Sequence, residues 1–241
     1  MKKDSLGDRM KGYENVSRIY LPRRMPLIIR LDGRAFHTFT RGFDRPYDKH
    51  LTSIMQYTAK ELCENISGAR LAYTQSDEIS ILITDYDDIS TEPWFGKNLQ
   101  KICSISASMC TLFFNRMFRE LLKGIRNNKI DQAMFDCRAF IVPKEDVYNY
   151  FLWRQKDAER NSIQMLAQAN YSHKELQGKN TAALHDLLMG KGINWNDVSV
   201  ANKRGACIHK KWVEELERWK FGIDFETPLF SDDPEYISRW V

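Results

Sequence analysis

Two short acidic segments of this 241-residue chain carry the side chains best suited to chemistry. Asp32 and Gly33 end one apolar run, and Ser76, Asp77 and Glu78 separate two further apolar runs. Two carboxylates a few ångströms apart repel each other unless a cation neutralises them. Magnesium suits such a pair, because it takes oxygen ligands and needs only one or two carboxylates besides water and substrate phosphates. A pair of magnesium ions favours in-line phosphoryl displacement, and a glycine such as Gly33 lets its carbonyl approach closely enough to be a ligand.

Either acidic segment alone is typical of an ordinary turn, so the metal hypothesis depends on a fold that brings them together. Apolar periodicity and turn residues predict the elements around them. In chain order we expect a strand at 27–31, a helix at 49–65 capped by Asp48, strands at 69–75 and 79–85, a helix at 97–123 and a strand at 137–143. This is the order of the split βαβ, or ferredoxin-like, unit. There the end of the first strand lies beside the start of the third, which places Asp32 next to Asp77.

The rest of the chain predicts additions to this unit. Residues 1–20 are expected to form a short helical or loose lead-in, and residues 144–189 are mostly helical in pattern. A strand-like stretch surrounds residues 206–208, and the tail after about residue 222 is expected to be partly irregular. The predicted class is α+β: a catalytic unit over 1–143, with 144–241 as additional helices and a small C-terminal extension packed on it.

Composition narrows the functional class only a little. The hydrophobic fraction of 43% and the charged fraction of 28% are those of an ordinary soluble globular protein. A net charge of +4 is compatible with a phosphate-rich partner without requiring one. The five cysteines are odd in number and lack zinc-ligand spacing. The charged N-terminal segment lacks the apolar stretch of a signal peptide, and no run approaches the ~20 apolar residues that span a bilayer. We therefore expect a cytoplasmic protein with no membrane partner.

Four motifs in fixed order resemble the tRNA-His guanylyltransferase family and its guanylyltransferase-like relatives. They are RLDGRAFHTFTRGFDRPYD, AYTQSDEISILI, FDCRAFIVP and YFLWRQKDAERN, which fall within about residues 25–165. The resemblance implies a domain similar to the palm of template-dependent polymerases, in an enzyme that extends RNA in the 3′–5′ direction. The 5′ end is first activated by adenylylation, or already carries a triphosphate, and the 3′-hydroxyl of an incoming nucleotide attacks it. Two Mg²⁺ per site, ATP or GTP as substrates, a tRNA partner and a homotetramer are implied with it.

Site residues carry over from the resemblance motif by motif. Asp32 and Asp77 would be the metal carboxylates, the Gly33 carbonyl a further ligand, Glu78 an accessory catalytic acid, and Ser76 a neighbour of nucleotide phosphate. The full set of implied nucleotide contacts is Arg30, Gly33, Arg34, Ala35, Phe36, His37, Arg45, Asp48, Lys49, Ser76, Lys97, Lys101 and Asn161. The implied tRNA contacts are Arg154, Lys203 and Arg204, the last two in a segment, Asn202 to Gly205, that resembles the family near the triphosphate.

Elementary chemistry supports some of these assignments and leaves others open. The first amides of the helix at Lys49 would suit an anion. Lys97 and Lys101, four apart in the next predicted helix, would share one face, although a solvated face is the ordinary alternative for both. Arg30 is either a substrate contact or a buried partner for a carboxylate.

One departure from the family pattern affects the substrate. Where eukaryotic members carry an HINN-type motif, this chain has Glu159, Arg160, Asn161 and Ser162. The change resembles the guanylyltransferase-like branch, whose members repair 5′-truncated tRNAs by templated addition. Three alternatives stay open: a strict tRNA-His guanylyltransferase, a nucleotide-cyclase-like palm enzyme, and an RNA-binding module with a vestigial acidic site.

Overall fold

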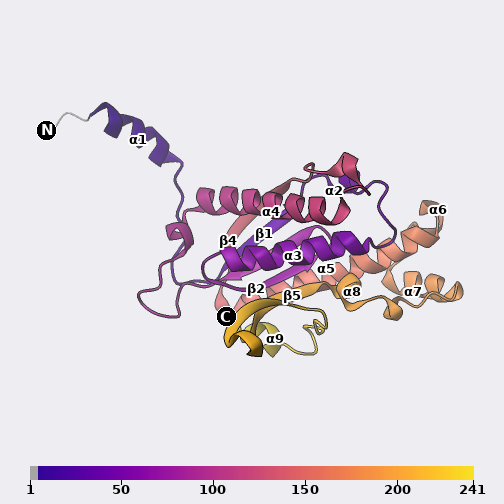
Figure 1. Ribbon diagram of the computed structural model, residues 1–241. Helices are drawn as coiled ribbons and strands as arrows, with labels where there is room; N and C mark the ends of the chain where they lie inside the picture. Colours follow the sequence, from indigo (N-terminus) through magenta and orange to yellow (C-terminus); the bar gives the residue numbers. More distant parts are fainter. Residues whose placement is uncertain (1–4) are drawn as a thin grey trace.

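The computed structural model describes residues 5–241 and is built on one six-stranded antiparallel sheet (Figure 1). Its strands are β1 (Leu27–Gly33), β2 (Ala69–Gln75), β3 (Glu78–Ile83), β4 (Phe135–Ile141), β5 (Ala206–Val213) and β6 (Arg218–Asp224). They lie in the order β4-β1-β3-β2-β5-β6. The sheet therefore crosses residue 143, because β5 pairs with β2 and extends the part formed by the first half of the chain.

Helices cover both faces of the sheet. The helices of the described residues are α1 (Leu6–Val16), α2 (Phe36–Phe39), α3 (Lys49–Asn65), α4 (Leu99–Leu122), α5 (Lys144–Asn170), α6 (His173–Leu176), α7 (Thr181–Gly190), α8 (Val200–Arg204) and α9 (Glu235–Ser238). Alternate side chains of a strand point to opposite faces. Ile29 and Leu31 accordingly join the core under α3 and α4, while Ile28 joins the core under α5 and α9 with Phe151 and Ile237.

The strand pairing predicted for the two acidic segments is confirmed. β1 and β3 are antiparallel neighbours, and Asp32 stands opposite Glu78 in register. The Gly33 amide donates a hydrogen bond to the Asp77 carbonyl, with the two atoms 3.1 Å apart. Segments far apart in the chain thus meet at one end of the sheet, where β1 stops and β3 starts.

Two boundaries differ from prediction because of local backbone geometry. The helix expected from Lys97 begins at Leu99: the Asn98 side chain caps it by accepting from the Lys101 amide at 3.0 Å. Phe95, Gly96 and Lys97 precede the cap with positive φ, which no α-helix allows. The strand expected at 137–143 lies instead at 135–141.

The tail is more ordered than predicted. Residues 218–224 form β6, which pairs along its length with β5. Beyond it, Phe230, Tyr236 and Ile237 are buried against the α5 side of the sheet. β6 was not predicted, since the run RWKFGID alternates charged and apolar residues too imperfectly to mark a strand. Residues 225–234 form no helix or strand, as expected of a partly irregular tail.

The lead-in contains a helix that stands apart from the rest. α1 projects away from the body (Figure 1), and none of its residues is buried. The chain rejoins the body where the Leu21 amide donates to the Lys97 carbonyl. No helix within residues 5–241 combines the length and apolarity that crossing a bilayer requires.

Candidate active site

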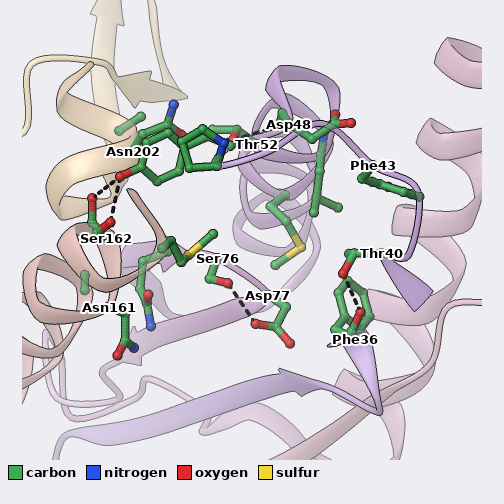
Figure 2. Close-up of a pocket in the computed structure, with 18 of the residues that line it drawn as sticks. Phe36, Thr40, Phe43, Asp48, Thr52, Ser76, Asp77, Asn161, Ser162 and Asn202 are labelled. Carbon is green, nitrogen blue, oxygen red and sulfur yellow. Dashed lines mark hydrogen bonds between the residues drawn. The ribbon is translucent and has the colours of Figure 1, made fainter. Parts of the chain in front are cut away.

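A cavity of about 510 Å³ opens beside the meeting point of β1 and β3. Its walls come from the loop after α2, the start of α3, the turn between β2 and β3, one face of α5, and α8 (Figure 2). Ligand pockets for small molecules span roughly 300–1,000 Å³. The cavity is thus large enough for a mononucleotide, and Asp77 lies on its wall.

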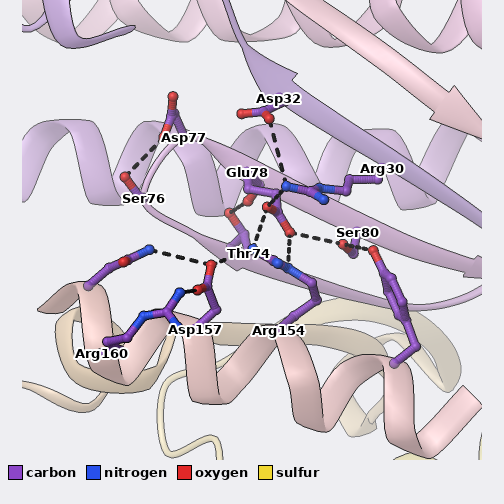
Figure 3. A network of polar contacts seen from close by, with 12 residues as sticks. Arg30, Asp32, Thr74, Ser76, Asp77, Glu78, Ser80, Arg154, Asp157 and Arg160 are labelled. Carbon is purple, nitrogen blue, oxygen red and sulfur yellow. Dashed lines mark hydrogen bonds and ion pairs between the residues drawn. The ribbon is translucent and has the colours of Figure 1, made fainter.

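Asp32 lies near Asp77, outside the lining of the cavity (Figure 3). The Ser76 hydroxyl donates to the Asp77 carboxylate at 3.0 Å. Burial raises the pKa of Asp77, the Ser76 hydrogen bond opposes this, and the charge of Asp32 raises the pKa further. The two carboxylates therefore repel across a partly desolvated gap, which a bound cation would relieve.

The donor chemistry here fits magnesium. Within residues 5–241 no group of three or more His, Cys, Asp or Glu side chains is placed to hold a metal ion. The available donors are two carboxylates and the Gly33 carbonyl, all oxygen. Mg²⁺ is commonly held by so few protein oxygens, with water and substrate phosphates completing the shell.

Glu78 has a different environment from its neighbour Asp77. Its carboxylate is 4% exposed and faces α5, where Arg154 donates to it through Nε at 2.7 Å and Nη2 at 2.8 Å (Figure 3). Nη2 of Arg30 lies 2.8 Å from the same carboxylate and 3.8 Å from that of Asp32. Arg30 is therefore a partly buried partner for carboxylates, and its contact with the nucleotide stays a prediction.

Comparison with known proteins fits this arrangement. The family model of tRNAHis guanylyltransferase matches residues 7–143, more than half of the chain. The chain belongs to that family. It is accordingly a nucleotidyltransferase, and the enzyme prediction is confirmed over the binding-module alternative.

Solved and curated relatives extend the match beyond residue 143. A bacterial tRNA(His) guanylyltransferase (Thg1)-like protein in complex with ATP superposes with a TM-score of 0.91 at 49% identity, covering 99% of both chains. One in complex with GTP gives a TM-score of 0.83 at 47% identity, covering 98% of this chain and 99% of the other. The tRNA(His) guanylyltransferase of Schizosaccharomyces pombe is 27% identical over 86% of this chain and 79% of its own.

The cavity gathers about half of the nucleotide contacts predicted for the enzyme. Those that line it are Phe36, His37, Arg45, Asp48, Ser76 and Asn161. Those outside its lining are Arg30, Gly33, Arg34, Ala35, Lys49, Lys97 and Lys101. Gln56, Gln75 and Gln168 also line the cavity and were not predicted. Isolated amide side chains have no charge or spacing that marks them in a sequence, and they would have been found only after the helices and strands around the cavity had been placed.

Lys97 departs most clearly from its predicted role. Its side chain is 1% exposed, and its ammonium lies 3.1 Å from Asp85 and 2.7 Å from the Met25 carbonyl. Asp85 follows the end of β3, whereas Asp77 precedes its start, so Lys97 is at the far end of the strand from the cavity. Lys101 is exposed in the first turn of α4. Because Lys97 precedes the helix, the prediction that the two lysines share one helical face was wrong.

The predicted tRNA contacts are also in contrasting positions. Arg154 is 3% exposed and bonded to Glu78 and Asp157, a placement that argues against direct contact with RNA. Lys203 donates to the Asn196 carbonyl at 2.6 Å and remains partly exposed. The Nε of Arg204 is buried and has no hydrogen-bond partner among the described residues.

Proposed function

We propose that the enzyme adds nucleotides to the 5′ end of truncated tRNA in the 3′–5′ direction, copying the opposite strand as template. The observation that carries the proposal is a nucleotide-sized cavity lined by Asp77, whose carboxylate is repelled by that of nearby Asp32. The sheet order β4-β1-β3-β2, with α3 and α4 on one face, supports a ferredoxin-like palm. Residues 1–143 would form this catalytic unit, and α5 and α8 from 144–241 would complete the nucleotide site.

Asp32, Asp77 and the Gly33 carbonyl would hold two Mg²⁺ ions. When bound, the ions supply positive charge for the attacking and leaving oxygens of an in-line displacement. The Ser76 hydroxyl holds the Asp77 carboxylate in place on the cavity wall. Arg45 on the same wall offers a guanidinium that suits the phosphates of ATP or GTP. The 5′ end of the RNA, once activated, would enter beside the carboxylates.

A specific observation favours repair over strict guanylylation of tRNA-His. Ser162, at the second asparagine position of the HINN-type motif, is 3% exposed. Its hydroxyl accepts from Trp195 at 3.0 Å and lies 2.8 Å from that of Tyr47. Because these partners hold the hydroxyl in the wall of the cavity, this position lacks the amide of the HINN-type motif, which supports a relaxed substrate.

The test uses a 5′-triphosphorylated tRNA that lacks its first nucleotide, with Mg²⁺ and all four nucleoside triphosphates. We expect restoration of the nucleotide that pairs with the opposing base, and a changed product when that base is changed. Addition of guanosine to tRNA-His alone would instead support the strict guanylyltransferase. A cyclic nucleotide formed without RNA would support the cyclase-like alternative.

Asp32→Ala and Asp77→Ala serve as active-site variants in the same assay. Each should abolish transfer while largely sparing RNA binding, because each removes a metal carboxylate. Transfer at the wild-type rate by either variant would contradict the metal assignment.

A further inference from the structure

The connection between α4 and β4, residues 123–134, packs against the segment that leads from β1 to α3. The Arg34 amide donates to the Met134 carbonyl at 2.9 Å. The Lys129 ammonium donates to the Thr38 carbonyl at 3.3 Å. This connection has no part in the proposed chemistry, yet it touches the segment that forms one wall of the cavity.

Arg126 makes the densest of these contacts, all with residues 42–48, here called the cavity loop. Its Nη1 donates to the Gly42 carbonyl at 2.5 Å, and its Nη2 lies 3.1 Å from the Asp48 carboxylate. Its guanidinium carbon lies 4.2 Å from the centre of the Phe43 ring, and its Nη2 lies 3.8 Å from Asp44. With its side chain only 18% exposed, one guanidinium thus joins four residues of a seven-residue loop, 42 to 48.

Asp48 fixes the other end of the same loop. Its carboxylate accepts from the His50 and Leu51 amides at 3.0 Å, which caps α3 as predicted. It also accepts from the Asp44 amide at 3.2 Å. Between these anchors lie Arg45 and Tyr47, both of which line the cavity. The loop therefore has fixed ends and a middle that faces the proposed nucleotide, with Arg45 exposed and Tyr47 half-buried.

We propose that Arg126 is a positioning residue of the nucleotide site: it holds the cavity loop in the shape in which Arg45 and Tyr47 face the cavity. The inference rests on the proposed function in one respect, that a nucleotide occupies this cavity. A loop ordered before binding loses less conformational entropy when the ligand arrives, so pre-organisation raises affinity. Arginine suits the task better than lysine, because its planar fork bonds two acceptors while its face stacks on an aromatic ring.

The variants follow from this geometry. Arg126→Met keeps the length of the side chain and removes every polar contact, whereas Arg126→Lys keeps the charge and loses the fork. The caps from Asp48 to α3 do not involve Arg126, so we expect both variants to fold. The matched control is Arg119→Met, because Arg119 comes from the same end of α4 and pairs with exposed Asp131, away from the cavity loop.

Three measurements decide the proposal: binding of GTP or ATP with Mg²⁺ by calorimetry, the KM and kcat of nucleotide addition, and hydrogen exchange of the cavity loop. For Arg126→Met we expect Kd and KM to rise about tenfold or more, with kcat changed less than about threefold. Arg126→Lys should fall between this variant and wild type, and Arg119→Met should match wild type. Hydrogen exchange of the amides at 42–48 should quicken in Arg126→Met.

The outcomes separate this proposal from the function on which it rests. Wild-type enzyme that binds no nucleotide would remove the proposed function itself. Wild-type binding together with unchanged Kd, KM and loop exchange in Arg126→Met would overturn the role of Arg126 alone. Should Arg126→Met fail to fold, a folded Arg126→Lys with wild-type KM and loop exchange would overturn it equally.

Discussion

Adjacent residues at the start of β3 have opposite environments. Asp77 faces the cavity and a second carboxylate, while Glu78, one residue on, faces α5 and two guanidinium groups. Strand alternation accounts for the division, since successive side chains point to opposite sides. The acidic pair in the sequence thus separates into one group free to bind a cation and one that is already neutralised.

Replacing Asp77 by Asn should stabilise the metal-free enzyme. The raised pKa of Asp77 means that its charged form is disfavoured in the folded state. Protonated Asp77 therefore stabilises the fold relative to the charged form. This stabilisation is complete below the unfolded pKa of ~3.9 and is lost as pH rises through the folded pKa. At pH 7 in chelator we expect Asp77→Asn to gain about 0.5–2 kcal/mol in thermal unfolding. The gain should shrink toward pH 4, and a wild type as stable as the variant at pH 7 would contradict the shift.

Replacing Glu78 by Gln should destabilise the fold strongly. The change leaves Arg154 and Arg30 without their shared carboxylate in the interior, and breaking a buried ion pair costs about 3–5 kcal/mol. Glu78→Gln with Arg154→Met should recover much of the loss, because fewer charges stay uncompensated. Arg160→Met is the matched control: its exposed pairing with Asp157 should matter by less than about 1 kcal/mol. Urea unfolding measures all three, and a mild effect of Glu78→Gln alone would count against the network.

Residue types together with the predicted order of strands and helices placed Asp32 beside Asp77, but they did not predict every partner of the acidic residues. Asp32 and Asp77 could be paired because the predicted topology brings the end of the first strand beside the start of the third, whatever side chains they carry. The bidentate bond from Arg154 was not, because a helix position does not reveal which strand residue it faces. Lys97 was misplaced for a related reason: its positive φ and its pairing with Asp85 depend on contacts remote in sequence.

At the scale of elements, α8 meets β2 through a glycine. Gly205 ends α8 with a φ of +78°, and a Cβ there would lie 2.6 Å from the Thr74 carbonyl and 2.7 Å from the Tyr73 ring. The Tyr73 hydroxyl in turn donates to the Arg204 carbonyl at 2.7 Å. This close approach brings α8, with Asn202, to the wall of the cavity.

Gly205→Ala should therefore cost both stability and nucleotide affinity. Steric overlap and backbone strain together predict a loss of about 2–4 kcal/mol. Gly192→Ala is the matched control, since Gly192 has a φ of +73° but nothing within 4 Å of an added Cβ, so strain alone should cost about 1 kcal/mol. Equal losses for the two variants, measured by denaturant unfolding, would show that the packing of α8 on β2 is not close.

Helices and strands were predicted correctly where the apolar periodicity was strong, and missed where pairing with another strand stabilises the element. α3 was placed over its exact residues because its apolar stripe and Asp48 cap agree. β6 was missed because its stability comes from β5 alongside it, not from its own alternation. The late start of α4 reflects a capping asparagine preceded by left-handed backbone, a combination that apolar spacing cannot reveal.

At the scale of the molecule, α1 is the part with the fewest ties to the rest. Leu6, Met10 and Tyr13 repeat at helical spacing and are 67%, 44% and 70% exposed. An isolated helix of this length is marginal in water. We propose that another subunit covers this stripe in the homotetramer that the family resemblance implies.

Removing residues 1–17 should separate assembly from folding. Since no α1 residue is buried within the described chain, the truncated protein should lose only the circular dichroism signal of this one helix and unfold within about 2–4 °C of the full chain. Light scattering should show a smaller assembly. If the assembly keeps the mass of the full-length one, less the deleted residues, the proposed role of α1 is contradicted. If the truncated protein does not fold, α1 contributes to the stability of the body after all.

The continuity of the sheet has a practical consequence for anyone dissecting the enzyme. A fragment that stops at residue 143 would keep Asp32, Asp77 and every strand up to β4. It would lack β5, so residues 71–74 of β2 would lose the strand with which they pair. A bare strand edge with unpaired amides and carbonyls invites other chains to add to it. Shortening the enzyme to its apparently catalytic half should therefore give insoluble aggregate in place of a minimal polymerase.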